Sequence, residues 1–262
     1  MSDSLEIHVD GALMELSLRR PEHRNAIDGD TAVLMTSTLR RASSDSGIRA
    51  VLLTGEGRDF CTGADLASAA DQAAKLSPLD YRWATRAFYE LTRSLWEIEK
   101  PVVTAVNGTV AGLGWSLALL GDLVVADRAA RWSHVFTRRG MVPHAGDTYY
   151  LPRILPMHQL MELALLNDTV TSERLAGIGA VNRLVDGDDL LPQARELGRR
   201  LADGPTRALG LTKQLYRNSL HRDIETVFES ERNATALIST TRDRVEGVKS
   251  LVERRTPDFT GN

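Results

Sequence analysis

The sequence predicts an α/β fold in which helices alternate with the strands of a largely parallel sheet. Three short apolar runs, residues 50–53, 102–106 and 123–126, lie between segments with helical spacing. Runs of this length are too short for independent helices, and their continuous apolar character is typical of strands buried on both faces. Because strand and helix alternate, we expect parallel strands joined by crossover helices. With 262 residues, 42% of them hydrophobic, the chain can bury a sizeable core.

The remaining elements follow from local patterns along the chain. From Leu5 to Leu18 apolar and polar residues alternate around the turn dipeptide Asp10-Gly11, which predicts a β-hairpin. Periodic segments predict helices at residues 31–44 and 78–96. Beyond Pro143 the chain is almost entirely helical, with helices predicted at residues 156–166, 172–177, 190–203, 205–219 and 222–240.

Composition and charge argue against several classes of function. The formal net charge is −3 and the basic residues are scattered in short clusters, so no nucleic-acid partner is expected. The polar first residues make a secretion signal unexpected, and no apolar run is long enough to span a membrane. The single cysteine, Cys61, is interpreted as a small buried residue rather than a nucleophile. We expect a soluble cytoplasmic protein without a metal site, because the sequence has no close His, Cys and Asp cluster with zinc-like spacing.

A glycine-rich turn at residues 107–114 is the most informative stretch of the chain. It follows the apolar run 102–106 and leads directly into a helical segment that begins near Leu113. Backbone N–H groups at such a position can meet an anionic oxygen of a thioester or phosphate without reorganisation. Gly112 and Gly114 allow close approach because they carry no Cβ. An ordinary tight connection between strand and helix would have the same pattern, so this turn alone does not define a site.

A second segment of the same kind makes a site the better interpretation. The apolar run 50–53 is followed by a loop rich in glycine and small residues that reaches Asp65. If the two loops converge, the N–H groups of Ala64 and Leu113 form a two-donor hole for a carbonyl oxygen that becomes an enolate. We therefore take Ala64 and Leu113 as catalytic candidates.

Four motifs together resemble the crotonase superfamily, which contains the enoyl-CoA hydratases and isomerases. They span nearly the whole chain in the order and spacing of that family: Arg20 to Ala26, Phe60 to Asp65, Asn107-Gly108 and Thr137 to Pro143. The resemblance implies a crotonase-like spiral of ββα units, with residues 1–200 as an acyl-CoA-binding core and residues 201–262 as a helical trimerisation region. It also implies an acyl-CoA substrate, so coenzyme A would enter as part of the substrate and no cofactor would be bound permanently.

The resemblance further implies where coenzyme A and the acyl group bind. The poorly patterned stretch from Ala67 to Tyr81 would form a mobile wall of the acyl pocket. Asn25 and Asp65 have a second interpretation as turn and cap residues. The residues expected along the adenine and pantetheine groove are Arg24, Asn25, Ala26, Ala64, Asp65 and Leu66.

The two glutamates of the hydratase pattern are replaced in this chain. The position in the first helix that carries one of them is Ser116, and the position ahead of the Gly-x-x-Pro turn is Phe136. A serine hydroxyl is a poor base near neutral pH, and phenylalanine transfers no proton. We therefore place Ser116 and Phe136 in the substrate pocket without a catalytic role. The resemblance is closest to an isomerase-like branch that lacks the hydratase glutamates.

His144 and Asp147 are the remaining candidates for acid–base work. His144 stands where the isomerase-like branch has an aspartate that moves a proton along the acyl chain. If a helix starts after Pro143, its positive end would favour a neutral imidazole that could act as a base. Asp147, three residues later, could orient that ring or face the pocket itself. His134 is interpreted instead as a packed core or interface residue.

The leading functional hypothesis is isomerisation of an enoyl-CoA, or a related proton shift, through the two-donor hole. One alternative is hydrolysis of a thioester or carbon–carbon bond through His144 and Asp147, and Ser116 with these two residues suggests a hydrolase triad. Another alternative is a catalytically silent acyl-CoA binder. The apolar stripe at residues 224–238 could pack within the chain or form an interface, and the resemblance favours a homotrimer or a dimer of trimers.

Overall fold

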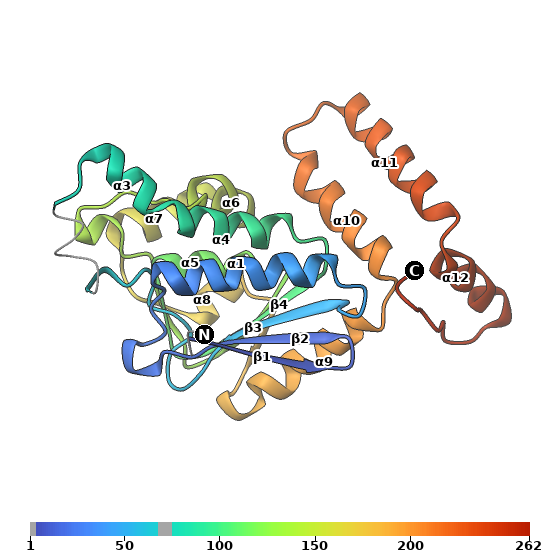
Figure 1. Ribbon diagram of the computed structural model, residues 1–262, viewed down its shortest axis with the longest axis horizontal. Coiled ribbons are helices and arrows are strands. Elements are labelled where there is room, and N and C mark those ends of the chain that lie inside the picture. Colours follow the sequence, from blue (N-terminus) through green and yellow to red (C-terminus); the bar gives the residue numbers. More distant parts are fainter. Residues whose placement is uncertain (1–3, 68–74) are drawn as a thin grey trace.

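The computed structural model, which describes residues 4–67 and 75–262, has a central six-stranded sheet with helices on both faces (Figure 1). Neighbouring strands are parallel throughout this sheet, except at the antiparallel pair of the N-terminal hairpin. This arrangement confirms the predicted α/β class and the predicted hairpin. In spatial order the strands are β1 (Leu5–Asp10), β2 (Leu13–Leu18), β3 (Ala50–Gly55), β4 (Val102–Val106), β6 (Leu123–Asp127) and β9 (Arg183–Val185).

The two faces of the sheet pack against different helices. Successive residues of a strand point to opposite faces, so Val51 joins the core under α1 (Gly29–Ser44) and α4 (Arg86–Glu97), whereas Leu52 joins the core under α9 (Leu190–Ala202). Every residue of β3 and β4 is buried. Burial on both faces explains why these strands are continuous apolar runs in the sequence.

A second, three-stranded sheet lies beside the first and carries the segments around the glycine-rich turn. Its strands are only two or three residues long, and the sequence pattern did not predict them because so short a run has no visible period. In spatial order they are β5 (Thr109–Ala111), β7 (Arg131–Ser133) and β8 (Val170–Thr171).

The helix predicted at residues 78–96 is two helices, α3 (Pro78–Ala84) and α4, separated at Thr85. The Thr85 hydroxyl donates to the carbonyls of Tyr81 (3.1 Å) and Arg82 (3.2 Å). Such back-bonding by threonine competes with the helical hydrogen bonds and often bends a helix. Of the stretch predicted to form a mobile pocket wall, residues 68–74 lie outside the described residues.

The second half of the chain is mostly helical, as predicted, with one additional helix. That helix, α12 (Arg242–Glu253), is preceded by the N-cap residue Thr241, whose side chain accepts a hydrogen bond from the Arg244 N–H group; threonine is a favoured residue at this position. Apart from α9, the other helices from the glycine-rich turn onward are α5 (Leu113–Leu119), α6 (Asp147–Ile154), α7 (Met157–Leu166), α8 (Ser172–Gly177), α10 (Thr206–Ser219) and α11 (Ile224–Ser239).

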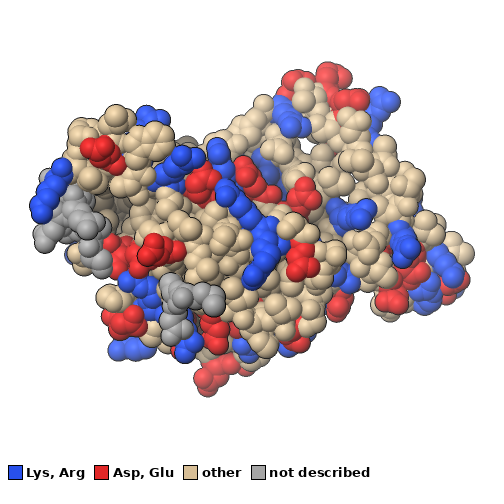
Figure 2. All heavy atoms as spheres, in the orientation of Figure 1, with Lys and Arg blue, Asp and Glu red and all other residues tan. Residues whose placement is uncertain are grey.

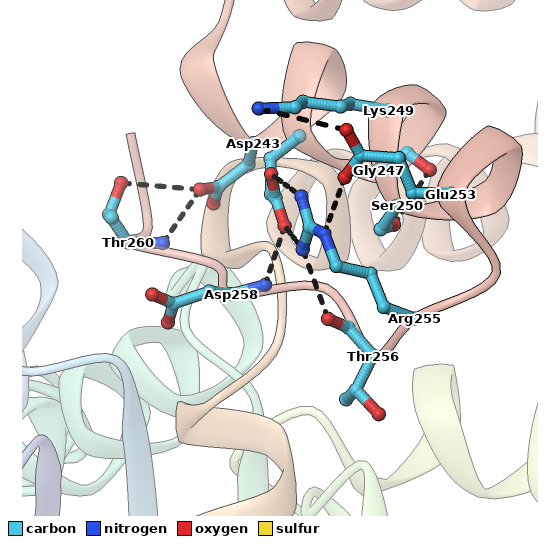
Figure 3. A network of polar contacts seen from close by, with 10 residues as sticks. Asp243, Gly247, Lys249, Ser250, Glu253, Arg255, Thr256, Asp258 and Thr260 are labelled. Carbon is cyan, nitrogen blue, oxygen red and sulfur yellow. Dashed lines mark hydrogen bonds and ion pairs between the residues drawn. The ribbon is translucent and has the colours of Figure 1, made fainter.

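The C-terminal tail folds back onto α12 through a network of polar contacts (Figure 3). Asp243 accepts hydrogen bonds from the N–H groups of Thr260 (2.7 Å) and Gly261 (2.9 Å). Arg255 pairs with Glu246, and its hydrogen bond to that carboxylate lowers the pKa of Glu246 to about 2. These contacts attach the last residues of the chain to its last helix.

Helices α10 to α12 lie to one side of the sheet, at the opposite end of the molecule from α3 (Figure 1). Within α11 only Ala234 is buried, whereas Ile224 and Phe228 are more than half exposed. Packing within the chain therefore covers little of the apolar stripe at residues 224–238. The division into residues 1–200 and 201–262, and assembly through this stripe, remain predictions.

Charges of both signs intermingle on the face of the molecule shown in Figure 2. A continuous basic track of the kind that follows a nucleic-acid backbone is not visible on the described part of that face. Among the described helices, none combines the length and the apolar character needed to span a membrane.

Lys213 attaches α10 to the core and makes the stability of the fold depend on pH. Its side chain is 8% exposed, and its Nζ lies 2.7 Å from a carboxylate oxygen of Asp122 and 3.0 Å from the Lys100 carbonyl oxygen. Burial lowers the pKa of Lys213 to about 8, against the opposing effect of Asp122. Above this value, and up to the ordinary lysine pKa of about 10.4, the unfolded chain binds a proton that the folded chain does not. Stability therefore rises with pH in this window.

We expect replacement of Lys213 by methionine to remove this dependence. Between about pH 7.5 and about pH 10, the free energy of unfolding of the wild type should rise by about 2 kcal/mol relative to that of Lys213→Met. Denaturant titrations of both proteins at the two pH values measure this difference. A difference between the two proteins that stays constant with pH would contradict the prediction.

Candidate active site

The two glycine-rich loops meet, as the sequence predicts. Cys61 and Val110 form a parallel β-bridge that joins the loop after β3 to β5. The Cys61 N–H group donates to the Thr109 carbonyl (3.2 Å), and the Ala111 N–H group donates to the Cys61 carbonyl (3.0 Å). The loop that contains Ala64 is therefore held in register with the strand that leads to Leu113.

Gly63 brings the backbone of the first loop against the start of α5. Its φ is 101°, in the region that glycine adopts without strain. A Cβ built on Gly63 would lie 2.9 Å from the Ala111 carbonyl oxygen and 3.3 Å from the Leu113 nitrogen. Only glycine therefore fits here without a backbone shift, and the segment next to Ala64 lies beside the Leu113 amide.

The N–H groups of Ala64 and Leu113 both lack an acceptor within the described chain. Ala64 forms a parallel bridge with Ile27, in which Ile27 N–H donates to the Gly63 carbonyl and Asp65 N–H donates to the Ile27 carbonyl, both at 2.8 Å. The N–H of the residue between those two bonds points away from the partner strand. Leu113 is the first residue of α5, and the first N–H groups of a helix have no acceptor within it. Two amides on adjoining segments are thus left without an acceptor among the described residues, as the predicted two-donor hole requires.

The residues predicted for the coenzyme A groove divide into two groups. The Asn25 side chain is buried and fully used in the turn: it accepts from Arg20 N–H (2.9 Å) and donates to the carbonyls of Glu56 (2.9 Å) and Asp59 (2.6 Å). This is its alternative role as a turn residue, so its side chain is not available to a ligand. Asp65 is also buried and pairs with Arg20 at 3.0 Å.

Arg24 and Leu66 are exposed, and Ala26 and Ala64 are half-buried. The Arg24 guanidinium is held by Asp59 (3.0 Å) and by the Thr109 hydroxyl (2.8 Å). Of the six residues predicted to line the coenzyme A groove, these four have exposed atoms that a ligand can contact.

Cys61 is a buried thiol, which agrees with its interpretation from the sequence as a small buried residue. Burial raises its pKa to about 12, and its sulfur accepts a hydrogen bond from the Gly63 N–H group at 3.4 Å. The thiolate is the nucleophilic form of cysteine. Cys61 therefore has no nucleophilic role near neutral pH.

Asp147 is the centre of a buried polar network that the sequence did not predict. One carboxylate oxygen accepts from the Ser116 hydroxyl at 2.6 Å, and the other lies 2.8 Å from His134 Nε2. The side chains of Asp147 and His134 are 0% and 1% exposed, and Ser116 is buried as well. Ser116 therefore faces Asp147 within the core and does not face an open pocket.

Two predictions about Asp147 and His144 are wrong. The helix does not start after Pro143, because Ala145 and Gly146 both adopt positive φ (56° and 88°) and delay its start to Asp147. His144 therefore precedes the helix by three residues and is not held at its end. Asp147 does not orient the His144 ring, because both of its oxygens are turned to Ser116 and His134.

The arrangement also excludes the suggested triad of Ser116, His144 and Asp147. In a hydrolase triad the histidine lies between the serine and the carboxylate, whereas here the carboxylate lies between the serine and a different histidine, His134. The sequence pattern favoured a packing role for His134 and contained no signal for its bond to Asp147.

His144 lies on the wall of a cavity of about 990 Å³ between α3, α4 and residues 140–144. Its ring packs edge-to-face on Phe136, with centroids 4.9 Å apart. The Phe136 ring in turn reaches within 4.0 Å of the Cβ position of Gly112, directly before Leu113. One aromatic ring thus separates the imidazole from the glycine turn. Other residues of the wall include Tyr81, Arg82, Trp83, Arg86, Tyr89 and Met141.

This chain belongs to the enoyl-CoA hydratase/isomerase family, the crotonase family, whose model matches residues 8–262. It is therefore an acyl-CoA-processing member of that family, and the resemblance and the fold expected from it are confirmed.

Individual relatives differ in the reactions they are named for. The 1,2-epoxyphenylacetyl-CoA isomerase of Escherichia coli (strain K12) is 36% identical over 262 residues, which is 100% of both chains. The carnitinyl-CoA dehydratase of Proteus mirabilis (strain HI4320) is 30% identical over 266 residues, again 100% of both chains. The crystal structure of an enoyl-CoA hydratase from Polaromonas sp. JS666 superposes with a TM-score of 0.92 at 27% identity, over 97% of this chain and 99% of that one.

Proposed function

We propose that this protein catalyses a proton shift in an acyl-CoA thioester, most simply the isomerisation of an enoyl-CoA. The observation that carries the proposal is that the amides of Ala64 and Leu113, on adjoining segments, have no acceptor among the described residues. Removal of an α-proton from a thioester converts its carbonyl into an enolate, and two fixed N–H donors stabilise that oxygen more strongly as negative charge develops.

His144 is the proposed proton carrier. Histidine is the residue type that exchanges protons near neutral pH, and His144 lies on the cavity wall next to Phe136. In the isomerisation of a 3-enoyl thioester, the imidazole takes a proton from the α carbon, and the electron pair of the broken C–H bond delocalises into a dienolate. Return of the proton to the γ carbon moves the double bond into conjugation with the thioester.

Hydration is the competing reaction, because dehydratases and hydratases are among the relatives. At the two hydratase glutamate positions this chain has Ser116, whose hydroxyl is engaged by Asp147, and Phe136. Neither side chain can activate a water molecule as a carboxylate does. These residues, together with the isomerase among the relatives, support a proton shift over hydration.

The remaining parts of the proposal concern binding and assembly. Arg24, Ala26, Ala64 and Leu66 would meet the adenine and pantetheine portion of the thioester. We also propose that the exposed apolar residues of α11 are covered in a homotrimer or a dimer of trimers.

The experiment that tests the function is incubation with a panel of 2-enoyl and 3-enoyl thioesters of coenzyme A in D₂O, followed by proton NMR. We expect deuterium at the α and γ carbons and movement of the double bond, with little 3-hydroxyacyl product. Rapid hydration of crotonyl-CoA would contradict the proposal. Release of free coenzyme A would favour a hydrolase, and binding of the panel without any exchange would favour a silent acyl-CoA binder.

A further inference from the structure

Ser116, Asp147 and His134 form a hydrogen-bonded network that is buried within the core. Its carboxylate has no exposed surface, and each oxygen has one short hydrogen bond. Burial of a carboxylate is costly even when it is well paired, and an apolar replacement is often equally stable. Stability of the fold is therefore a weak explanation for this network.

The three residues come from the three segments that carry the proposed site. Ser116 lies one helical turn after Leu113 on α5, and Asp147 is the first residue of α6. His134 follows β7 and is separated from Phe136 by one residue. The network thus ties the start of α5, with its available amide, to the segments on which Phe136 and His144 lie.

The chain between His134 and Phe136 is held in an uncommon conformation. Val135 has a φ of 54°, which is rare for a β-branched residue. The Phe136 N–H group donates to the His134 carbonyl at 2.8 Å across this tight turn. Strained turns of this kind persist where the surrounding structure fixes them, and they occur preferentially at functional sites.

The polar contacts of His134 depend on Asp147 alone within the described chain. Its Nδ1 atom is buried without a hydrogen-bond partner, and the ring is otherwise packed edge-to-face against Trp115 (5.9 Å between centroids) and Phe136 (4.8 Å). Loss of the Asp147 side chain would therefore release both the His134 ring and the Ser116 hydroxyl.

On the basis of the proposed function, we propose that Ser116, Asp147 and His134 are positioning residues. They hold the first turn of α5, and with it the Leu113 amide, in register with the segments that carry Phe136 and His144. Because the hole acts most strongly on the developing enolate, a small displacement of this amide lowers kcat more than it changes the binding of the thioester.

Three variants separate positioning from proton transfer by Asp147. Asp147→Ala leaves both neighbours unpaired and should lower kcat for α-proton exchange by about tenfold to a hundredfold, with KM changed less than threefold. Ser116→Ala should act in the same direction and covers the case in which Asp147→Ala does not fold. Asp147→Asn can still accept from Ser116 and donate to His134 in its other tautomer, so it should recover most of the activity.

A matched control lies at the other end of the same helix. The Thr104 hydroxyl is buried and donates to the Ala118 carbonyl at 2.9 Å, in the last turn of α5. Thr104→Val removes this bond without touching the network, so it should reduce the melting temperature and leave kcat per folded molecule unchanged.

Amide hydrogen exchange measured by mass spectrometry tests whether the network stabilises the start of α5, and this test does not depend on enzymatic activity. Ser116→Ala and Asp147→Ala should speed exchange at the start of α5, whereas Thr104→Val should not. If the wild type shows no proton exchange with any thioester, the proposed function fails while the amide measurements still test the network. The positioning proposal is overturned if Asp147→Asn is as inactive as Asp147→Ala, or if kcat and the amides of α5 are unaffected by both alanine variants.

Discussion

Replacement of Gly63 by alanine should reduce kcat by about 10²–10³-fold, the loss typical of removing one donor from an oxyanion hole. A Cβ at this position would lie 2.9 Å from the Ala111 carbonyl oxygen and 3.3 Å from the Leu113 nitrogen. Because these neighbours are backbone atoms, the loop that carries Ala64 must move away from the start of α5. In the proposed mechanism, the two amides would then no longer converge on one oxygen. Steady-state kinetics of α-proton exchange, expressed per folded molecule, measure the effect.

Gly11 offers a matched control for the backbone strain that alanine introduces at positive φ. It has a φ of 59° in the turn of the N-terminal hairpin, and a Cβ there would meet no atom within 4 Å. Gly11→Ala should cost about 1–2 kcal/mol of stability, the penalty for a left-handed residue, and leave kcat unchanged. Wild-type turnover in Gly63→Ala would show that the amides of Ala64 and Leu113 are not the hole.

The parts of the fold that were predictable from the sequence are those in which a hydrophobic pattern continues over several residues. The strands β3, β4 and β6 are apolar runs because both faces of the sheet are covered, and the hairpin alternates around Asp10-Gly11. The convergence of the two glycine-rich loops was predictable for the same reason: each follows a strand of the parallel sheet, and β3 and β4 are neighbours. The carboxyl ends of neighbouring parallel strands meet at one edge.

The polar network was not predictable, because its geometry depends on two local departures from regular backbone. Proline at position 143 is a common start signal for a helix, but the positive φ of Ala145 delays that start and turns Asp147 into the core. Val135, the residue after His134, also has a positive φ. Neither residue type favours that conformation, so the sequence contains no signal for it. As a result, the histidine that contacts Asp147 is His134, and His144 lies on the cavity wall.

Replacement of His144 by alanine should lower kcat for proton exchange by about 10²–10⁴-fold, the contribution expected of a general acid–base group. The two-donor hole would remain intact, so affinity for the thioester should change little. His158 on α7 is exposed and is not among the residues that line the cavity next to His144, and His158→Ala should keep wild-type activity. Equal activity of His144→Ala and the wild type would exclude His144 as the proton carrier.

His144→Asp is the sharper test, because it distinguishes loss of a proton carrier from loss of a ring that packs on Phe136. An aspartate at position 144 matches the isomerase-like branch that this chain resembles. If His144 carries the proton, the carboxylate of His144→Asp should take over part of the acid–base contribution. This variant should then recover at least about a tenth of the activity that His144→Ala loses. If His144 only packs against the Phe136 ring, at 4.9 Å between centroids, aspartate should be no better than alanine.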